Sequence, residues 1–128
     1  MSLVRNKDSK PEMLVRRLIH RMGFRYRLHQ AGLPGRPDLV FAGRRKVVFV
    51  HGCFWHRHSN SACKLARLPK SNVEFWRGKL EANRIRDEAV LANLSKLGWK
   101  SMVVWECECR QREQLENRLR AFLEVEGE

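Results

Sequence analysis

Residues 51–58, His-Gly-Cys-Phe-Trp-His-Arg-His, place three imidazoles, a thiol and two large aromatic rings directly after an apolar run. The run, residues 47–50, is rich in β-branched and aromatic residues, which is typical of a buried strand. Loops of ordinary composition rarely carry so many metal-ligand types. The pattern therefore predicts a strand that leads into a metal-binding or nucleic-acid-binding loop. The alternative is a loop whose rings pack on the core and whose histidines are merely solvated.

The charge of the chain indicates what it binds. Its 128 residues include 26 Lys and Arg against 14 Asp and Glu, a formal net charge of +12. A compact domain this basic most often binds a polyanion, and nucleic acid is the first candidate, although a basic surface can also be merely solvated. We find neither an 18-residue apolar stretch nor a signal-peptide pattern, so we expect no membrane span and no secretion signal.

Periodicity and turn signals predict one α/β domain over residues 1–128. Capping-box patterns at Ser9-x-x-Glu12 and Ser71-x-x-Glu74 open two helices, which end near Gly23 and Leu97. A third helix is expected from about residue 110 to 125. Strands are expected at residues 24–28, 38–41, 46–50 and 99–105, and residues 51–70 are expected to be irregular. This alternation predicts one mixed sheet covered by helices.

The cysteines indicate a zinc site. Without a secretion signal they are expected to be reduced, so metal ligation is favoured over disulfides. Cys53-x4-His58-x4-Cys63, followed by the distant Cys107, supplies the ligand types of a tetrahedral Cys3His zinc site, although its spacing is wider than that of a common zinc knuckle.

A second centre is predicted around Asp38. Only four turn residues separate its strand from the next, so the two strands should form a hairpin that brings Asp38 beside Val50 and His51. A carboxylate beside a backbone carbonyl suits Mg²⁺, and histidines such as His51 and His56 can take a proton from water. For Asp38 alone, turn chemistry is the competing interpretation. We interpret His20 and His29 as surface residues on a basic face.

Several segments together resemble the very-short-patch-repair mismatch endonucleases, a branch of the PD-(D/E)XK, or restriction-endonuclease-like, fold. They run in the same order over nearly the whole chain. They are Lys7-Asp8-Ser9-x-x-Glu12, Leu33-Pro34-Gly35-Arg36-Pro37-Asp38, His51-Gly-Cys-Phe-Trp-His56, Phe75-Trp76-x2-Lys79-x3-Asn83-x2-Arg86-Asp87, Leu97-Gly98-Trp99 and Trp105-Glu106-Cys107.

The resemblance implies a catalytic centre. Asp38 and the main-chain carbonyl of Val50 would bind catalytic Mg²⁺, although many relatives have threonine where this chain has Val50. The two catalytic histidines of the family fall on His51 and His56. The first-helix glutamate, which orders a water at the metal, falls on Glu12.

The resemblance also implies a structural zinc ion and a set of wedges. The zinc ligands would be Cys53, His58, Cys63 and Cys107, with Cys109 as a possible substitute for Cys107. Family members open the duplex by inserting apolar side chains between base pairs, and these wedges match Phe54, Trp55 and, on an N-terminal arm, Met1.

The expected function is Mg²⁺-dependent nicking of one DNA strand 5′ to the thymine of a T:G mismatch, which arises when 5-methylcytosine deaminates. The resemblance further implies a monomer in the bacterial cytoplasm, with a functional link to a cytosine-5 methyltransferase. Two alternatives stay open. One is a nickase of the same fold with another target, associated with restriction or defence, and the other is a non-catalytic zinc-containing DNA-binding module.

Overall fold

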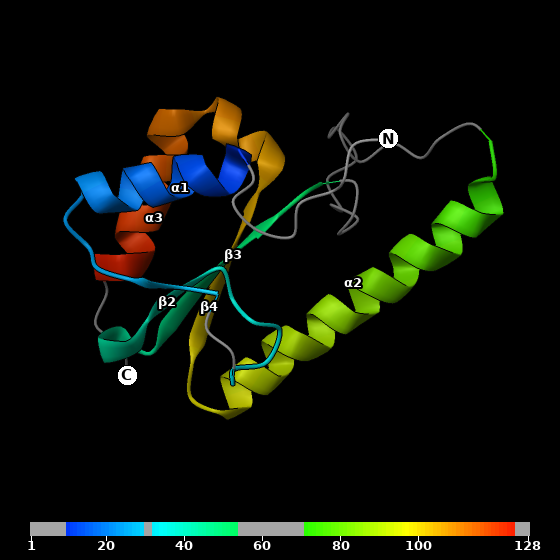
Figure 1. The fold of residues 1–128 in the computed structure, drawn as a ribbon, viewed down its shortest axis with the longest axis horizontal. Coiled ribbons are helices and arrows are strands. Elements are labelled where there is room, and N and C mark those ends of the chain that lie inside the picture. Colours follow the sequence, from blue (N-terminus) through cyan, green and yellow to red (C-terminus); the bar gives the residue numbers. More distant parts are fainter. Residues whose placement is uncertain (1–9, 30–31, 54–70, 125–128) are drawn as a thin grey trace.

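The computed structural model describes residues 10–29, 32–53 and 71–124 (Figure 1). Within these residues, three helices and four strands form a single mixed α/β arrangement, with short 3₁₀ turns at Ala42–Arg44 and Glu106–Arg110. In chain order they are α1 (Lys10–Arg21), β1 (Arg27–Leu28), β2 (Leu39–Phe41), β3 (Lys46–His51), α2 (Val73–Lys96), β4 (Lys100–Trp105) and α3 (Arg112–Glu124).

The four strands make one sheet in the order β1-β2-β3-β4. The pairs β1–β2 and β2–β3 are antiparallel, whereas β3 and β4 run parallel, with His51 opposite Trp105 at their C-terminal ends. The sequence prediction of a mixed sheet covered by helices is confirmed, and so is the hairpin that joins β2 and β3.

Helices α1 and α3 cover one face of the sheet, and α2 covers the other (Figure 1). The first face holds the larger core, in which Leu18 of α1 and Leu119 of α3 pack with strand residues such as Val48. On the second face Leu94 of α2 packs with Val47 and other strand residues. None of the described helices is both long and apolar enough to cross a membrane.

Two side-chain hydrogen bonds fix the C-terminal end of α3 against the β2–β3 hairpin. The Lys46 side chain is 1% exposed, and its Nζ donates to the carbonyl of Phe122 at 2.5 Å. The Arg44 guanidinium donates to the carbonyl of Leu123 at 2.8 Å. Both carbonyls lie in the last turn of α3, where the helix leaves its carbonyl groups without partners of its own, so these cations complete the helix end.

Several sequence predictions differ from the structure. Strand β1 covers only two of the five predicted residues, and both are exposed. The N-cap of α2 is Asn72 in a left-handed conformation with no side-chain cap, so the capping box predicted at Ser71 is wrong. The apolar stripe predicted for α2 is buried only at Leu80 and Leu94, while Phe75 and Ile85 are more than half exposed.

Candidate active site

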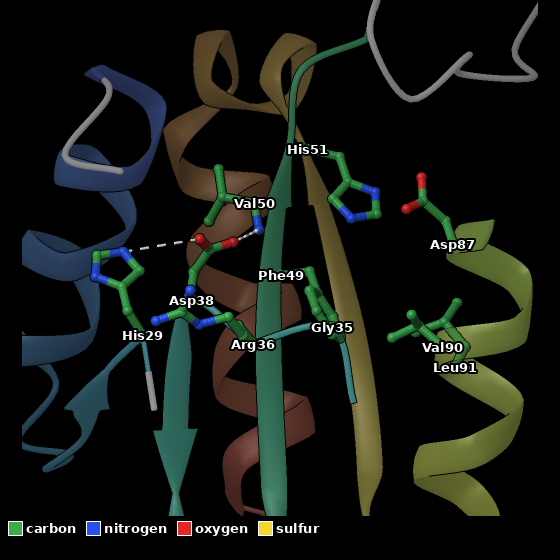
Figure 2. Close-up of a pocket in the computed structure, with 10 residues that line it drawn as sticks. All are labelled: His29, Gly35, Arg36, Asp38, Phe49, Val50, His51, Asp87, Val90 and Leu91. Atoms are coloured by element: carbon green, nitrogen blue, oxygen red, sulfur yellow. Dashed lines mark hydrogen bonds and ion pairs between the residues drawn. The ribbon is translucent and has the colours of Figure 1, made fainter. Parts of the chain in front are cut away.

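A cavity of about 510 Å³ opens at the C-terminal end of β3 (Figure 2). One side is formed by the segment that precedes β2, and the other by the middle of α2. The lining combines acidic, imidazole and basic groups with apolar walls, as enzyme sites often do. The lining residues are His29, Gly35, Arg36, Asp38, Phe49, Val50, His51, Asp87, Val90 and Leu91.

Asp38 lies immediately before β2 and lines this cavity. Its Oδ2 accepts a hydrogen bond from the backbone N–H of Val50 at 2.7 Å, so the side chain extends the β2–β3 ladder by one contact. In an extended strand the N–H and carbonyl of one residue point to the same edge, so the Val50 carbonyl also faces the β2 side. The predicted proximity of Asp38 and Val50 is therefore confirmed.

Glu12 reaches the same place from α1. Its side chain is 3% exposed, and its Oε2 lies 2.5 Å from Nη2 of Arg16 and 2.7 Å from Nε2 of His29. The Glu12 carboxylate therefore contacts His29, which lies outside α1. Ser9, the other half of the predicted capping box, lies outside the described residues.

His29 is the site residue that the sequence interpretation missed. We predicted a surface histidine, which is correct for the exposed His20 but wrong for His29. Its Nε2 lies 3.8 Å from Oδ1 of Asp38 (Figure 2), and it lies 2.7 Å from Oε2 of Glu12. The available signal was the spacing: His29 directly follows an edge strand that pairs with the strand after Asp38, and the backbone N–H of His29 donates to the Asp38 carbonyl at 3.1 Å.

His51 lies on the other side of β3 from Asp38 (Figure 2). The residue is 7% exposed, and its ring packs between Phe49 and Trp105, with centroids 5.7 and 5.3 Å away. The Asp87 side chain on α2 points toward the imidazole across the cavity. The structure thus brings Glu12, Asp38 and His51 to one end of the sheet, whereas His56 lies outside the described residues.

The predicted zinc ligands are described only in part. Cys53 is fully buried, and it lies two residues beyond His51, while Cys107 lies two residues beyond Trp105. Since His51 and Trp105 are paired in parallel strands, both cysteines leave the sheet at the same edge. The other two predicted ligands, His58 and Cys63, and the predicted wedges Phe54, Trp55 and Met1 lie outside the described residues.

The Cys109 side chain lies against the core of the α1/α3 face. Its Sγ faces the carbonyl of Pro11 at 4.0 Å, and its side chain packs against the core beneath α1 and α3. Burial, with smaller effects from Glu108 and Glu106, raises the pKa of the Cys109 thiol to about 11. The Cys109 side chain thus packs toward the core of the α1/α3 face, whereas Cys107 follows Trp105 at the end of β4.

The donor set at Asp38 fits a divalent cation. Oxygen or nitrogen atoms of Glu12, His29 and Asp38 lie within 4.8 Å of one another, and Glu12 is buried. Two carboxylates supply the negative charge and the hard oxygen atoms that Mg²⁺ and Mn²⁺ prefer. The arrangement can therefore hold a cation beside a phosphate group that enters the cavity.

Comparison with known proteins agrees with this geometry. The family model for the DNA mismatch endonuclease Vsr matches residues 1–62. The chain is 50% identical to the type II nicking enzyme V.XorIIP of Xanthomonas oryzae pv. oryzae over 97% of this chain and 89% of that protein. It is 42% identical to the type II nicking enzyme V.NmeAIP of Neisseria meningitidis over 93% of this chain and 83% of that protein.

A third relative is the DNA mismatch endonuclease Vsr of Escherichia coli, which is 40% identical over 90% of this chain and 72% of that protein. These similarities extend over nearly the whole chain, including the Asp38 and His51 segments. The chain therefore belongs to the Vsr family of DNA mismatch endonucleases, and it is a DNA endonuclease.

Proposed function

We propose that this endonuclease hydrolyses one strand of a DNA duplex 5′ to the thymine of a T:G mismatch. The observation that carries the proposal is the Asp38 carboxylate, fixed by the Val50 N–H beside buried Glu12 in an open cavity. A phosphodiester needs such a carboxylate cluster because a cation must offset the charge on its oxygens. A non-catalytic DNA-binding module has no need of this cluster.

Asp38 and the Val50 carbonyl are the residues proposed to hold Mg²⁺, with Glu12 ordering water nearby. When bound, the cation would supply Lewis-acid stabilisation of charge on the phosphoryl and leaving oxygens. The chain supplies the geometry: Oδ2 of Asp38 accepts the hydrogen bond from the Val50 N–H, and Oδ1 lies 3.8 Å from Nε2 of His29.

His51 and His56 are proposed to move the proton in this hydrolysis. A water oxygen forms the new bond to phosphorus, its proton passes to an imidazole, and the bond from phosphorus to the 3′-oxygen breaks. The products are a 3′-hydroxyl, which takes up a proton, and a 5′-phosphate. Imidazole suits this role because it titrates near neutral pH. The rings that flank His51 restrict its orientation, and Asp87 faces it across the cavity.

Phe54 and Trp55 are proposed as the wedges that select the mismatch, with Met1 as a third. A T:G step costs less to unstack than a matched step, so insertion of a ring converts weak pairing into preference. Each stacked ring contributes roughly 1–3 kcal/mol, so Phe54→Ala or Trp55→Ala should each lower the preference for T:G by about tenfold or more.

A structural zinc ion bound by Cys53, His58, Cys63 and Cys107 is proposed to hold this aromatic segment. The shared sheet edge of Cys53 and Cys107 supports it. Elemental analysis should then find about one zinc per chain, and Cys107→Ala should lower folded yield as well as activity. Purified, active, zinc-free protein would contradict the zinc proposal.

A cytosine-5 methyltransferase is the proposed functional companion, since deamination of its product creates the T:G mismatch. We further propose that the enzyme acts as a monomer in the bacterial cytoplasm. The basic surface should make DNA binding weaken steeply with salt because bound counterions are released.

The second candidate is nicking of another target, because two of the relatives named above are type II nicking enzymes. One assay separates the two candidates. Duplexes with matched or T:G pairs, placed in several flanking contexts and labelled on each strand, are incubated with enzyme and Mg²⁺. Mismatch repair predicts nicks only 5′ to the mispaired thymine. Equal nicking of matched duplex at one fixed sequence would overturn the T:G proposal and support the alternative.

A further inference from the structure

We propose that His29 supplies an imidazole nitrogen to the cation site of Glu12 and Asp38, so that the site binds Mn²⁺ in preference to Mg²⁺. The inference rests on the proposed function, because it assigns a ligand and a metal preference to that same site, and it has Glu12 bind the cation directly instead of through a water molecule. Three elements deliver the three side chains: α1, the segment after β1, and the segment before β2.

The first argument is the position of the His29 nitrogen. Nε2 lies 2.7 Å from Oε2 of Glu12 and 3.8 Å from Oδ1 of Asp38. The same atom is buried, yet it makes no hydrogen bond of acceptable direction within the described part of the chain. A charge-assisted hydrogen bond at 2.7 Å would align the N–H with its acceptor. Close approach without alignment is instead the arrangement of two ligands that converge on one cation.

The second argument is how firmly His29 is held. Its backbone N–H donates to the Asp38 carbonyl at 3.1 Å, which couples the two residues directly. Its φ of 45° lies in the left-handed region, which residues other than glycine seldom adopt. Such strained residues are frequent at functional sites, where the surrounding structure fixes them. With this backbone conformation the imidazole of His29 points toward the Asp38 carboxylate (Figure 2), and it also lies beside the Glu12 carboxylate.

The chemical class of the ligands then sets the metal preference. Mg²⁺ strongly prefers oxygen ligands and keeps much of its water, whereas first-row transition metals accept imidazole nitrogen readily. Among these, Mn²⁺ also retains the affinity for carboxylates that Glu12 and Asp38 require. A nitrogen from His29 should therefore strengthen binding of Mn²⁺ much more than binding of Mg²⁺.

Mn²⁺ alone is the probe for the test, with the full chain and no DNA. Free Mn²⁺ is followed by its electron paramagnetic resonance (EPR) signal, Mg²⁺ affinity is measured by competition, and pulsed EPR records ¹⁴N coupling to the bound ion. His29→Gln should weaken Mn²⁺ binding about tenfold or more, comparable to the losses seen when groups around metal sites are removed. It should change Mg²⁺ affinity less than about threefold and abolish the strong ¹⁴N coupling.

His20→Gln is the matched control, because His20 is an exposed histidine on α1 that does not line the cavity. Thermal unfolding of each variant verifies folding. Unchanged Mn²⁺ affinity in His29→Gln, or persistent ¹⁴N coupling, would overturn the inference and leave His29 as an ion-pair partner of Glu12. Asp38→Asn separates this failure from that of the proposed function. If Asp38→Asn loses Mn²⁺ while His29→Gln retains it, only the role of His29 fails, and if Asp38→Asn also retains it, the proposed cation site fails as well.

Discussion

The two faces of the sheet are covered in different ways. On one face the short helices α1 and α3 bury regularly spaced side chains, including Leu115, Leu119 and Leu123 of α3. On the other face the 24-residue helix α2 buries only Leu80 and Leu94. The first face is continuous core, whereas the second contributes the wall of the cavity through Asp87, Val90 and Leu91. The α1/α3 face thus carries most of the core, whereas the α2 face carries little core and forms one wall of the cavity.

The largest effect expected from this comparison is on stability. Leu119→Ala empties a fully buried position on the α1/α3 face and should lower the free energy of unfolding by about 2–5 kcal/mol. Ile85→Ala on α2, where Ile85 is 56% exposed, should change it by no more than about 0.5 kcal/mol. Urea denaturation of both variants measures the difference. Similar losses in the two variants would mean that α2 contributes as much core as α3.

A smaller effect is expected at the end of α3. Lys46→Met removes a charged donor to the Phe122 carbonyl and should cost roughly 1.5–3 kcal/mol. Lys100 is the matched control, because it pairs with Lys46 across β3 and β4 but is exposed. Lys100→Met should stay within about 0.5 kcal/mol in the same denaturation experiment. An equal loss in free energy of unfolding in the two variants would mean that the hydrogen bond from Lys46 does not stabilise the C-terminal end of α3.

The smallest expected effect on stability is at Gly35, where the segment before β2 packs against α2. Gly35 has a φ of +74°, and a Cβ there would lie 2.5 Å from Cγ1 of Val90 on α2. Gly35→Ala should therefore destabilise the protein by about 1–2 kcal/mol and reduce nicking, because the cavity wall must move. Gly78→Ala is the control: no atom of the described residues lies within 4 Å of the added methyl group on α2, so this variant should be more stable by roughly 0.5–1 kcal/mol. Differential scanning calorimetry gives both signs, and stabilisation by Gly35→Ala would contradict the close packing of this turn on α2.

The parts of the fold that the sequence predicts are those with strong local signals. The run 46–50 reads as a buried strand because its residues are apolar without interruption, and the β2–β3 hairpin follows from the short turn. The apolar stripe of α2 misled the prediction, because periodicity reports that a helix has an apolar side and not whether the sheet is wide enough to cover it. Four strands reach only part of a 24-residue helix.

The candidate site likewise contains residues that the sequence predicts and one that it does not. Asp38 and His51 were predictable because turn length and strand register place them at one sheet end. His29 was not, because it follows an edge strand of only two residues and its position depends on a left-handed backbone and a tertiary contact with Glu12. The position of His29 directly after a predicted strand was the available signal, but it reports neither the left-handed backbone nor the contact with Glu12.

The catalytic role proposed for the Asp38 carboxylate is tested most directly by measuring DNA nicking by the Asp38→Asn variant. The asparagine oxygen can still accept the Val50 N–H, so the fold should be kept while the negative charge is lost. Under single-turnover conditions with Mg²⁺ and a T:G duplex, we expect nicking at least about 10²–10³-fold slower than wild type, as for loss of a group that stabilises transition-state charge. DNA affinity should be unchanged or higher, because a negative charge near the phosphates is removed. Nicking at the wild-type rate by the folded variant would contradict a catalytic role for Asp38 and place the catalytic centre elsewhere.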